Sequence, residues 1–167
     1  MEGKRPVFVG VALVLIVGAL IYSFYRNQSP ARITLDVPDG ITAGQEISVP
    51  LRLSTRETMN AAEFYFNFSN DLLEVVRIDT AGSFYQLWVT GSPKFNNTTG
   101  ELSFEGGLPT PGFSGNDGLV ATVIFTAKTS GSGQITLDET KSRVLANDGT
   151  GTKIEATFRP ITVRVRP

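Results

Sequence analysis

The chain has 167 residues, of which 41% are hydrophobic and 19% charged, and its formal net charge is -1. This is the composition of one ordinary globular domain, and it lacks the basic excess that nucleic-acid binding requires. The sequence holds no His and no Cys, which excludes thiol nucleophiles, Ser-His-Asp triads, the usual zinc sites and disulfide support.

An uncharged apolar run occupies residues 7–25 (VFVGVALVLIVGALIYSFY). As a helix it would extend about 28 Å, which is enough to cross the hydrocarbon core of a bilayer. Lys4 and Arg5 precede the run and Arg26 follows it. The run therefore predicts a single uncleaved transmembrane anchor.

This anchor sets the expected topology of the chain. Residues 1–6 would lie in the cytoplasm, residues 26–31 would form a linker, and residues 32–167 would form a domain outside the cytoplasm. A cleaved signal peptide followed by secretion stays the alternative, although the small-residue cleavage pattern after the run is poor.

Beyond residue 31 the sequence changes to short runs rich in Val, Ile, Thr and Phe, separated by Gly, Pro, Asn and Asp. Such spacing is typical of an antiparallel sandwich or barrel. Nine strands are expected, at residues 32–37, 46–53, 61–68, 73–79, 83–90, 101–106, 119–128, 133–145 and 161–166. We therefore predict an all-β fold with two packed sheets, each burying one face.

The strand expected at residues 61–68 (AAEFYFNF) alternates at every step. Phe64 and Phe66 fall on one side, while Glu63, Tyr65 and Asn67 fall on the other. Because successive side chains of a strand point to opposite faces, the phenylalanines are expected in the core. The polar side must then meet either water or a partner.

Several stretches of the chain, taken in order, resemble the cohesin domain family. They are VPLRL (49–53), AEFYFNFSNDLLEVV (62–76), GELSFEG (100–106), GLVATVIFTAKTSGSGQITL (118–137), NDGTGTKI (147–154) and ITVRV (161–165). The resemblance implies a nine-stranded jelly-roll β-sandwich over residues 33–165. It also implies a non-catalytic module that captures dockerin modules and so docks enzymes such as glycoside hydrolases onto a scaffold or cell surface.

Cohesins present a rather flat sheet face to the dockerin helices, and the resemblance carries this face onto two strands of this chain. The implied partner-binding residues are Glu63, Tyr65, Asn67, Ser103 and Glu105. Outward carboxylates on such a face would suit a helix carrying Ser, Thr, Lys or Arg. Many dockerin-binding cohesins carry an Asn and an Asp where this chain has Ala61 and Glu63, so partner specificity does not carry over.

Two other functions compete with capture of a protein partner. A surface carbohydrate-binding module would stack sugar rings on exposed aromatic side chains, and Tyr85 and Trp88 are the candidates. Core packing is the simpler interpretation of Trp88. A structural envelope domain that binds nothing is the third possibility.

Catalysis and metal binding find little support in the sequence. Glu101 and Glu105 would lie about 13 Å apart along one strand, farther than the about 5–9.5 Å of glycosidase carboxylate pairs. The loops around Asp117 and Asp148 lack the evenly spaced oxygen ligands of a calcium loop, so they are interpreted as turns. We therefore expect no enzyme activity, no cofactor and no metal site.

Overall fold

The computed structural model describes residues 16–18 and 29–167. Residues 16–18 are helical. The rest of the anchor predicted at 7–25 lies outside the described residues, as do residues 1–6 and residues 26–28 of the linker. Within the described ranges, no helix has the length and apolar character needed to span a membrane.

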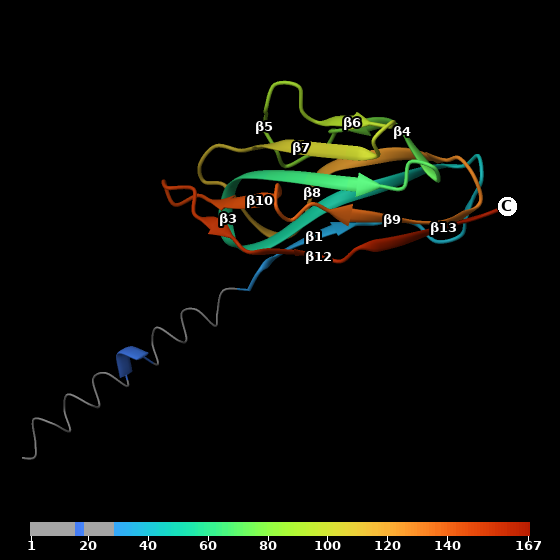
Figure 1. Cartoon of the computed structure of the whole chain (residues 1–167). Helices are drawn as coiled ribbons and strands as arrows, with labels where there is room; N and C mark the ends of the chain where they lie inside the picture. Colours follow the sequence, from blue (N-terminus) through green and yellow to red (C-terminus); the bar gives the residue numbers. More distant parts are fainter. Residues whose placement is uncertain (1–15, 19–28) are drawn as a thin grey trace, which may run out of the picture.

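Strands are the only regular secondary structure in the described residues 29–167 (Figure 1). The strands are β1 (Ala31–Leu35), β2 (Ile41–Thr42), β3 (Glu46–Phe68), β4 (Leu73–Asp79), β5 (Leu87–Trp88), β6 (Lys94–Asn96), β7 (Glu101–Gly107), β8 (Phe113–Ala127), β9 (Gly131–Leu137), β10 (Arg143–Ala146), β11 (Lys153–Ile154), β12 (Ala156–Phe158) and β13 (Ile161–Arg166). The all-β sandwich predicted from the sequence is confirmed.

The first layer is formed around the N-terminal half of β3. This half pairs antiparallel with β1 on one side and with β8 on the other. The strand β4 adds to the far side of β8, and β12 runs parallel to β1 at the opposite edge.

The second layer is formed around the C-terminal half of β3. There β7 pairs along one side, from Ala61–Gly107 to Asn67–Glu101, and the short strands β5 and β6 add to the outer side of β7. On the other side β3 pairs with β10 and then with β9. The strands β13 and β2 extend the layer beyond β9, and β11 extends it beyond β10.

Aromatic side chains fill the space between the layers. Phe66 of the second layer contacts Phe158 of the first edge-to-face, with ring centroids 5.3 Å apart. Phe68 contacts Phe125 of β8 in the same way at 5.4 Å. Phe64 and Phe66 are buried as expected, which confirms the alternation, and Leu102 and Phe104 of β7 are buried beside them. The core therefore fixes which side of β3 and β7 faces outward.

The strand boundaries differ from the sequence-based expectation in four places, and the first is the strand expected at 119–128, which begins at Phe113 as β8. The strands expected at 46–53 and 61–68 form one continuous strand of 23 residues, because the polar segment between them keeps pairing with β8 through register shifts. The strand expected at 133–145 is divided into β9 and β10 by a turn that Asp138 holds. The strand expected at 83–90 is reduced to β5, since Tyr85 turns into the core.

Thirteen strands are therefore present in the described chain instead of the nine expected. The four that the sequence did not indicate are β2, β6, β11 and β12, which have two or three residues each. Segments this short carry too little periodicity to be recognised.

Candidate partner-binding face

The five predicted partner-binding residues lie together on the outer side of the second layer. The register pairs Glu63 with Glu105 and Tyr65 with Ser103, and it places Asn67 opposite Glu101. We call this surface, formed by Glu63, Tyr65 and Asn67 of β3 with Ser103 and Glu105 of β7, the β3–β7 face. Its residues come from adjacent strands, so the sheet itself fixes their spacing.

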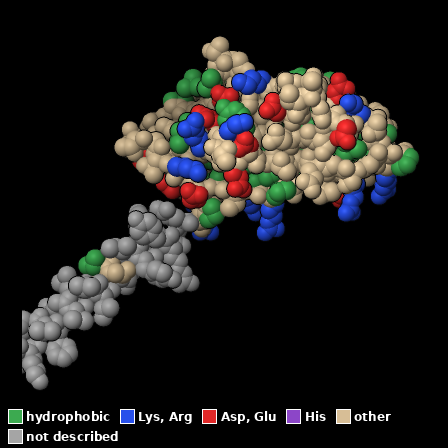
Figure 2. All heavy atoms as spheres, viewed as in Figure 1, with side chains coloured by type: hydrophobic (Ala, Val, Ile, Leu, Met, Phe, Trp, Pro, Cys, Tyr) green, Lys and Arg blue, Asp and Glu red, His purple; other side chains and the backbone are tan. Residues whose placement is uncertain are grey.

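The carboxylates of the β3–β7 face already have cationic neighbours. Arg143 of β10 pairs with Glu63 at 2.8 Å, and Lys94 of β6 pairs with Glu105 at 3.7 Å. Beside the face, Lys141 pairs with Asp138 at 3.2 Å. Acidic and basic side chains are interspersed over most of the side of the molecule seen in Figure 2, with no large patch of one sign. The two outward carboxylates of the face, Glu63 and Glu105, therefore already form ion pairs within the chain.

Tyr65 is held in place from the neighbouring turn. Its backbone N–H donates to the Ser142 hydroxyl at 3.0 Å, and its carbonyl accepts from the Asp138 N–H at 2.8 Å. Partial burial raises the pKa of the Tyr65 hydroxyl, and the carboxylates of Glu105 and then Glu63 raise it further, against the opposing effect of Arg143. The Tyr65 phenol thus stays protonated at neutral pH and can donate a hydrogen bond.

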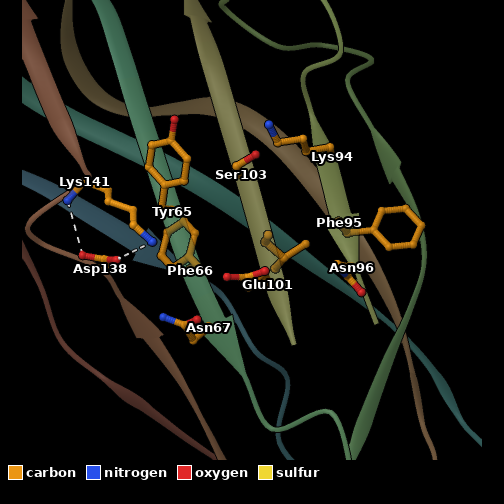
Figure 3. A pocket seen from close by; sticks show the side chains of 11 residues that line it. Tyr65, Phe66, Asn67, Lys94, Phe95, Asn96, Glu101, Ser103, Asp138 and Lys141 are labelled. Carbon is orange, nitrogen blue, oxygen red and sulfur yellow. Dashed lines mark hydrogen bonds and ion pairs between the residues drawn. The ribbon is translucent and has the colours of Figure 1, made fainter. Parts of the chain in front are cut away.

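A hollow of about 500 Å³ lies between β3, β6 and the turn after β9 (Figure 3). Its polar lining consists of Tyr65, Asn67, Lys94, Asn96, Glu101, Ser103, Asp138 and Lys141. Glu101 is also engaged, because the Thr99 hydroxyl donates to its carboxylate at 2.6 Å. Because of this hollow, the β3–β7 face is concave on one side and not flat like a plain strand pair.

Ser103 differs from the expectation of an exposed contact residue. It lies on the outer side of β7, yet it is only 4% exposed. Tyr65 and Lys94 stand directly opposite it on the two neighbouring strands, and the Ser103 side chain lies between theirs (Figure 3). Within the described chain its hydroxyl has no hydrogen-bond partner.

An apolar row borders the β3–β7 face, and sequence reasoning missed it. Pairing places Leu145, Ala61, Gly107 and Leu87 opposite one another in four successive strands. Leu87 is 61% exposed, and the nearby Val89 is 52% exposed. The sequence did contain a signal for this row. Leu87 and Val89 stand two positions apart, so in a strand they lie on the same side.

The aromatic residues proposed for sugar binding do not form an exposed platform. Tyr85 is buried, and its hydroxyl donates to the Ala62 carbonyl at 3.3 Å. Trp88 is half-buried, packs against the core and lies 5.0 Å from the Tyr85 ring. Tyr85 therefore offers no ring face to a ligand, and Trp88 follows the core interpretation.

The acidic loops serve as turns. Asp148 accepts hydrogen bonds from the N–H groups of Thr150 and Gly151 and from the Thr152 hydroxyl. Asp117 exchanges bonds with the Ser54 hydroxyl. No group of three or more potential metal ligands is found among residues 16–18 and 29–167.

Comparison with known proteins gives a family and a set of similar folds. The model of the cohesin domain matches residues 31–165. No curated protein matches the chain.

Three solved structures illustrate the fold similarity. One is the third cohesin of ScaC in complex with the ScaB dockerin from Acetivibrio cellulolyticus, with 21% identity and a TM-score of 0.61 over 81% of this chain and 98% of that one. A second is the Coh-OlpC–Doc435 cohesin–dockerin complex from Clostridium thermocellum, with 14% identity and a TM-score of 0.66 over 81% and 93%. A third is a non-cellulosomal cohesin from the archaeon Archaeoglobus fulgidus, with 20% identity and a TM-score of 0.59 over 83% and 92%.

Proposed function

The chain belongs to the cohesin domain family, and on that premise we infer that it captures dockerin-type protein modules through its β3–β7 face. The observation that carries this proposal is the register of β3 and β7. It brings Glu63, Tyr65, Asn67, Ser103 and Glu105 into one contiguous outward surface. Two of the similar solved structures are described as cohesin–dockerin complexes, which supports a protein as the partner.

The chemistry of the surface suits a protein partner. Tyr65 supplies amphipathic contact area at the centre, and the apolar row with Leu87 supplies surface that gains from being covered. Paired charges surround both, as a polar rim does in known interfaces. A partner that runs along β3 and β7 would contact the apolar row and then the polar rows in succession.

We further propose that the run at 7–25 anchors the module in a membrane with the sandwich outside the cytoplasm. The support is the length of the run, its lack of charge and its flanking basic residues. In that position the module would attach dockerin-bearing enzymes, such as those that degrade polysaccharides, to the cell surface. Catalysis would belong to the captured enzymes.

Direct binding tests this function. The full chain in mild detergent is titrated with a panel of purified dockerin modules by calorimetry. At least one module should bind, and Tyr65→Ala should weaken that binding at least about tenfold, as truncation of a central aromatic contact does. Ser48→Ala, on the first-layer half of the same strand, should change the affinity less than about twofold. Absence of binding to every module would refute the proposal.

A further inference from the structure

Ser103 stands apart from the other buried polar side chains of the described chain. Thr55 donates its hydroxyl proton to the Glu57 carbonyl at 2.8 Å, and Ser142 accepts from the Tyr65 N–H at 3.0 Å. Ser103 is as buried as Thr55, but its hydroxyl has no partner in the described part of the chain. A buried hydroxyl without a hydrogen bond loses its hydration without compensation, and native structures hold few of them. Its place in the molecule therefore requires an explanation.

The Ser103 hydroxyl belongs to the hollow of the β3–β7 face and not to the apolar core. Figure 3 shows Ser103 between Tyr65 and Lys94, with Lys94 extending from β6 toward it. The core residues Leu102 and Phe104 flank it in sequence and point to the opposite side of β7. The serine is thus covered from the outside by side chains, at the centre of the surface proposed to receive a partner.

The cover that Lys94 provides is weakly held. The Lys94 side chain is 66% exposed, and its ammonium lies 3.7 Å from Glu105, beyond ordinary hydrogen-bond distance. By comparison, the Arg143–Glu63 pair on the same face closes to 2.8 Å. The Lys94 stem is flexible, so it can move aside while its ammonium stays near the Glu105 carboxylate, whose side chain is only 17% exposed. Its displacement would open the Ser103 hydroxyl to an incoming group.

The charges around the hollow indicate which group fits. Lys94 has Glu105, Lys141 has Asp138, and Glu101 has the Thr99 hydroxyl. An incoming ion would have to break one of these interactions or be covered without a counter-ion, which is unfavourable. An uncharged hydroxyl or amide needs only one hydrogen-bond partner, which Ser103 supplies as donor or acceptor.

We propose that the Ser103 hydroxyl is a hydrogen-bonding site, covered by the Lys94 side chain in the unbound protein, for an uncharged polar side chain of the docked partner. This inference rests on the proposed function, since it assigns the chemistry of one contact within the β3–β7 face. Of the Ser, Thr, Lys or Arg side chains expected on a partner helix, it assigns the uncharged ones to the Ser103 hydroxyl.

The first test needs no partner and compares two serines on either side of Tyr65. Urea unfolding of the full chain in mild detergent is followed for Ser103→Ala and Ser142→Ala. The Ser103→Ala midpoint should equal or exceed that of the unsubstituted protein, because an unpaired hydroxyl is removed. The Ser142→Ala midpoint should fall, because the Tyr65 N–H loses its acceptor. An equal fall for both would show that Ser103 is already engaged within the folded chain, and would overturn the proposal.

The second test measures binding to a dockerin module that binds the unsubstituted protein. Ser103→Ala should raise the Kd about 5- to 10-fold, the usual effect of losing one hydrogen bond. The ratio of the two Kd values should change less than about twofold between 0.1 and 0.5 M NaCl, because the lost contact carries no charge. Unchanged affinity of Ser103→Ala, or a Kd ratio that changes steeply with salt, would refute the Ser103 site while leaving dockerin capture intact. Failure of the unsubstituted protein to bind any dockerin would instead refute the proposed function and this contact with it.

Discussion

Substitution of Phe66 by Ala should remove a large part of the stability of the sandwich. Phe66 is 1% exposed and contacts Phe158 of the other layer and Phe104 of its own layer edge-to-face, with ring centroids 5.3 and 6.1 Å away. The backbone around Phe66 cannot easily move into the space that the ring leaves, because β3 pairs with β7 on one side and with β9 on the other. The cavity should therefore stay largely open, which places the cost at about 4–5 kcal/mol, the upper part of the range for Phe→Ala.

The loss can be measured by urea unfolding of the full chain in mild detergent, followed by the fluorescence of its single tryptophan. A cost of about 4 kcal/mol corresponds to a fall in Tm of about 10–15 °C for a chain of this size. The control is Phe95→Ala in β6, whose side chain is 41% exposed and whose removal should cost less than about 1 kcal/mol. Equal losses for the two variants would contradict the position of Phe66 between the layers, and with it the outward assignment of Tyr65 and Asn67.

Two further predictions concern turns. Hydrogen bonds from the Thr152 hydroxyl and the Thr150 N–H lower the pKa of Asp148 below the usual value of about 3.9, so its stabilising effect is present at neutral pH and is lost as the pH falls below about 4. The urea midpoint of Asp148→Asn should therefore lie below that of the unsubstituted protein at pH 7. The difference between the two midpoints should become smaller as the pH falls. A difference that does not change with pH would exclude the Asp148 carboxylate as its cause. Gly100→Ala should lower the unfolding free energy at least twice as much as Gly149→Ala, for which about 1 kcal/mol is expected. Both glycines have positive φ, but a Cβ at Gly100 would overlap the Phe68 carbonyl, whereas a Cβ at Gly149 meets no atom within 4 Å; equal losses in thermal unfolding would refute the close approach.

The sequence predicted the inner side of the sandwich better than its outer side. Alternation in β3 placed Phe64 and Phe66 in the core, because period-2 patterning depends only on neighbours along one strand. The same rule placed Ser103 on the outer side but could not indicate that it is covered. That cover comes from Lys94, on a strand of three residues that pairs with β7.

The ion pairs of the face were equally inaccessible to sequence reasoning. Glu63 and Arg143 are 80 positions apart, and only the pairing of β3 with β10 brings them together. Tyr85 shows a second limit of sequence reasoning. Residues 83–90 have the composition of a strand, yet only Leu87–Trp88 form one, because the Tyr85 ring is buried in the core. Composition indicates which secondary structure a segment can form, and tertiary packing decides whether the segment forms it.

Because β3 runs unbroken through both layers, a bound partner should affect local opening in the rest of the module. If one sheet opened alone, half of β3 would lose its inter-strand hydrogen bonds while the other half kept them. The two sheets are therefore expected to open as one cooperative unit. A ligand that binds only the closed form makes such openings rarer throughout the unit. Amide hydrogens of β1 and β4, on the sheet remote from the partner, should then exchange with solvent more slowly whenever the β3–β7 face is occupied.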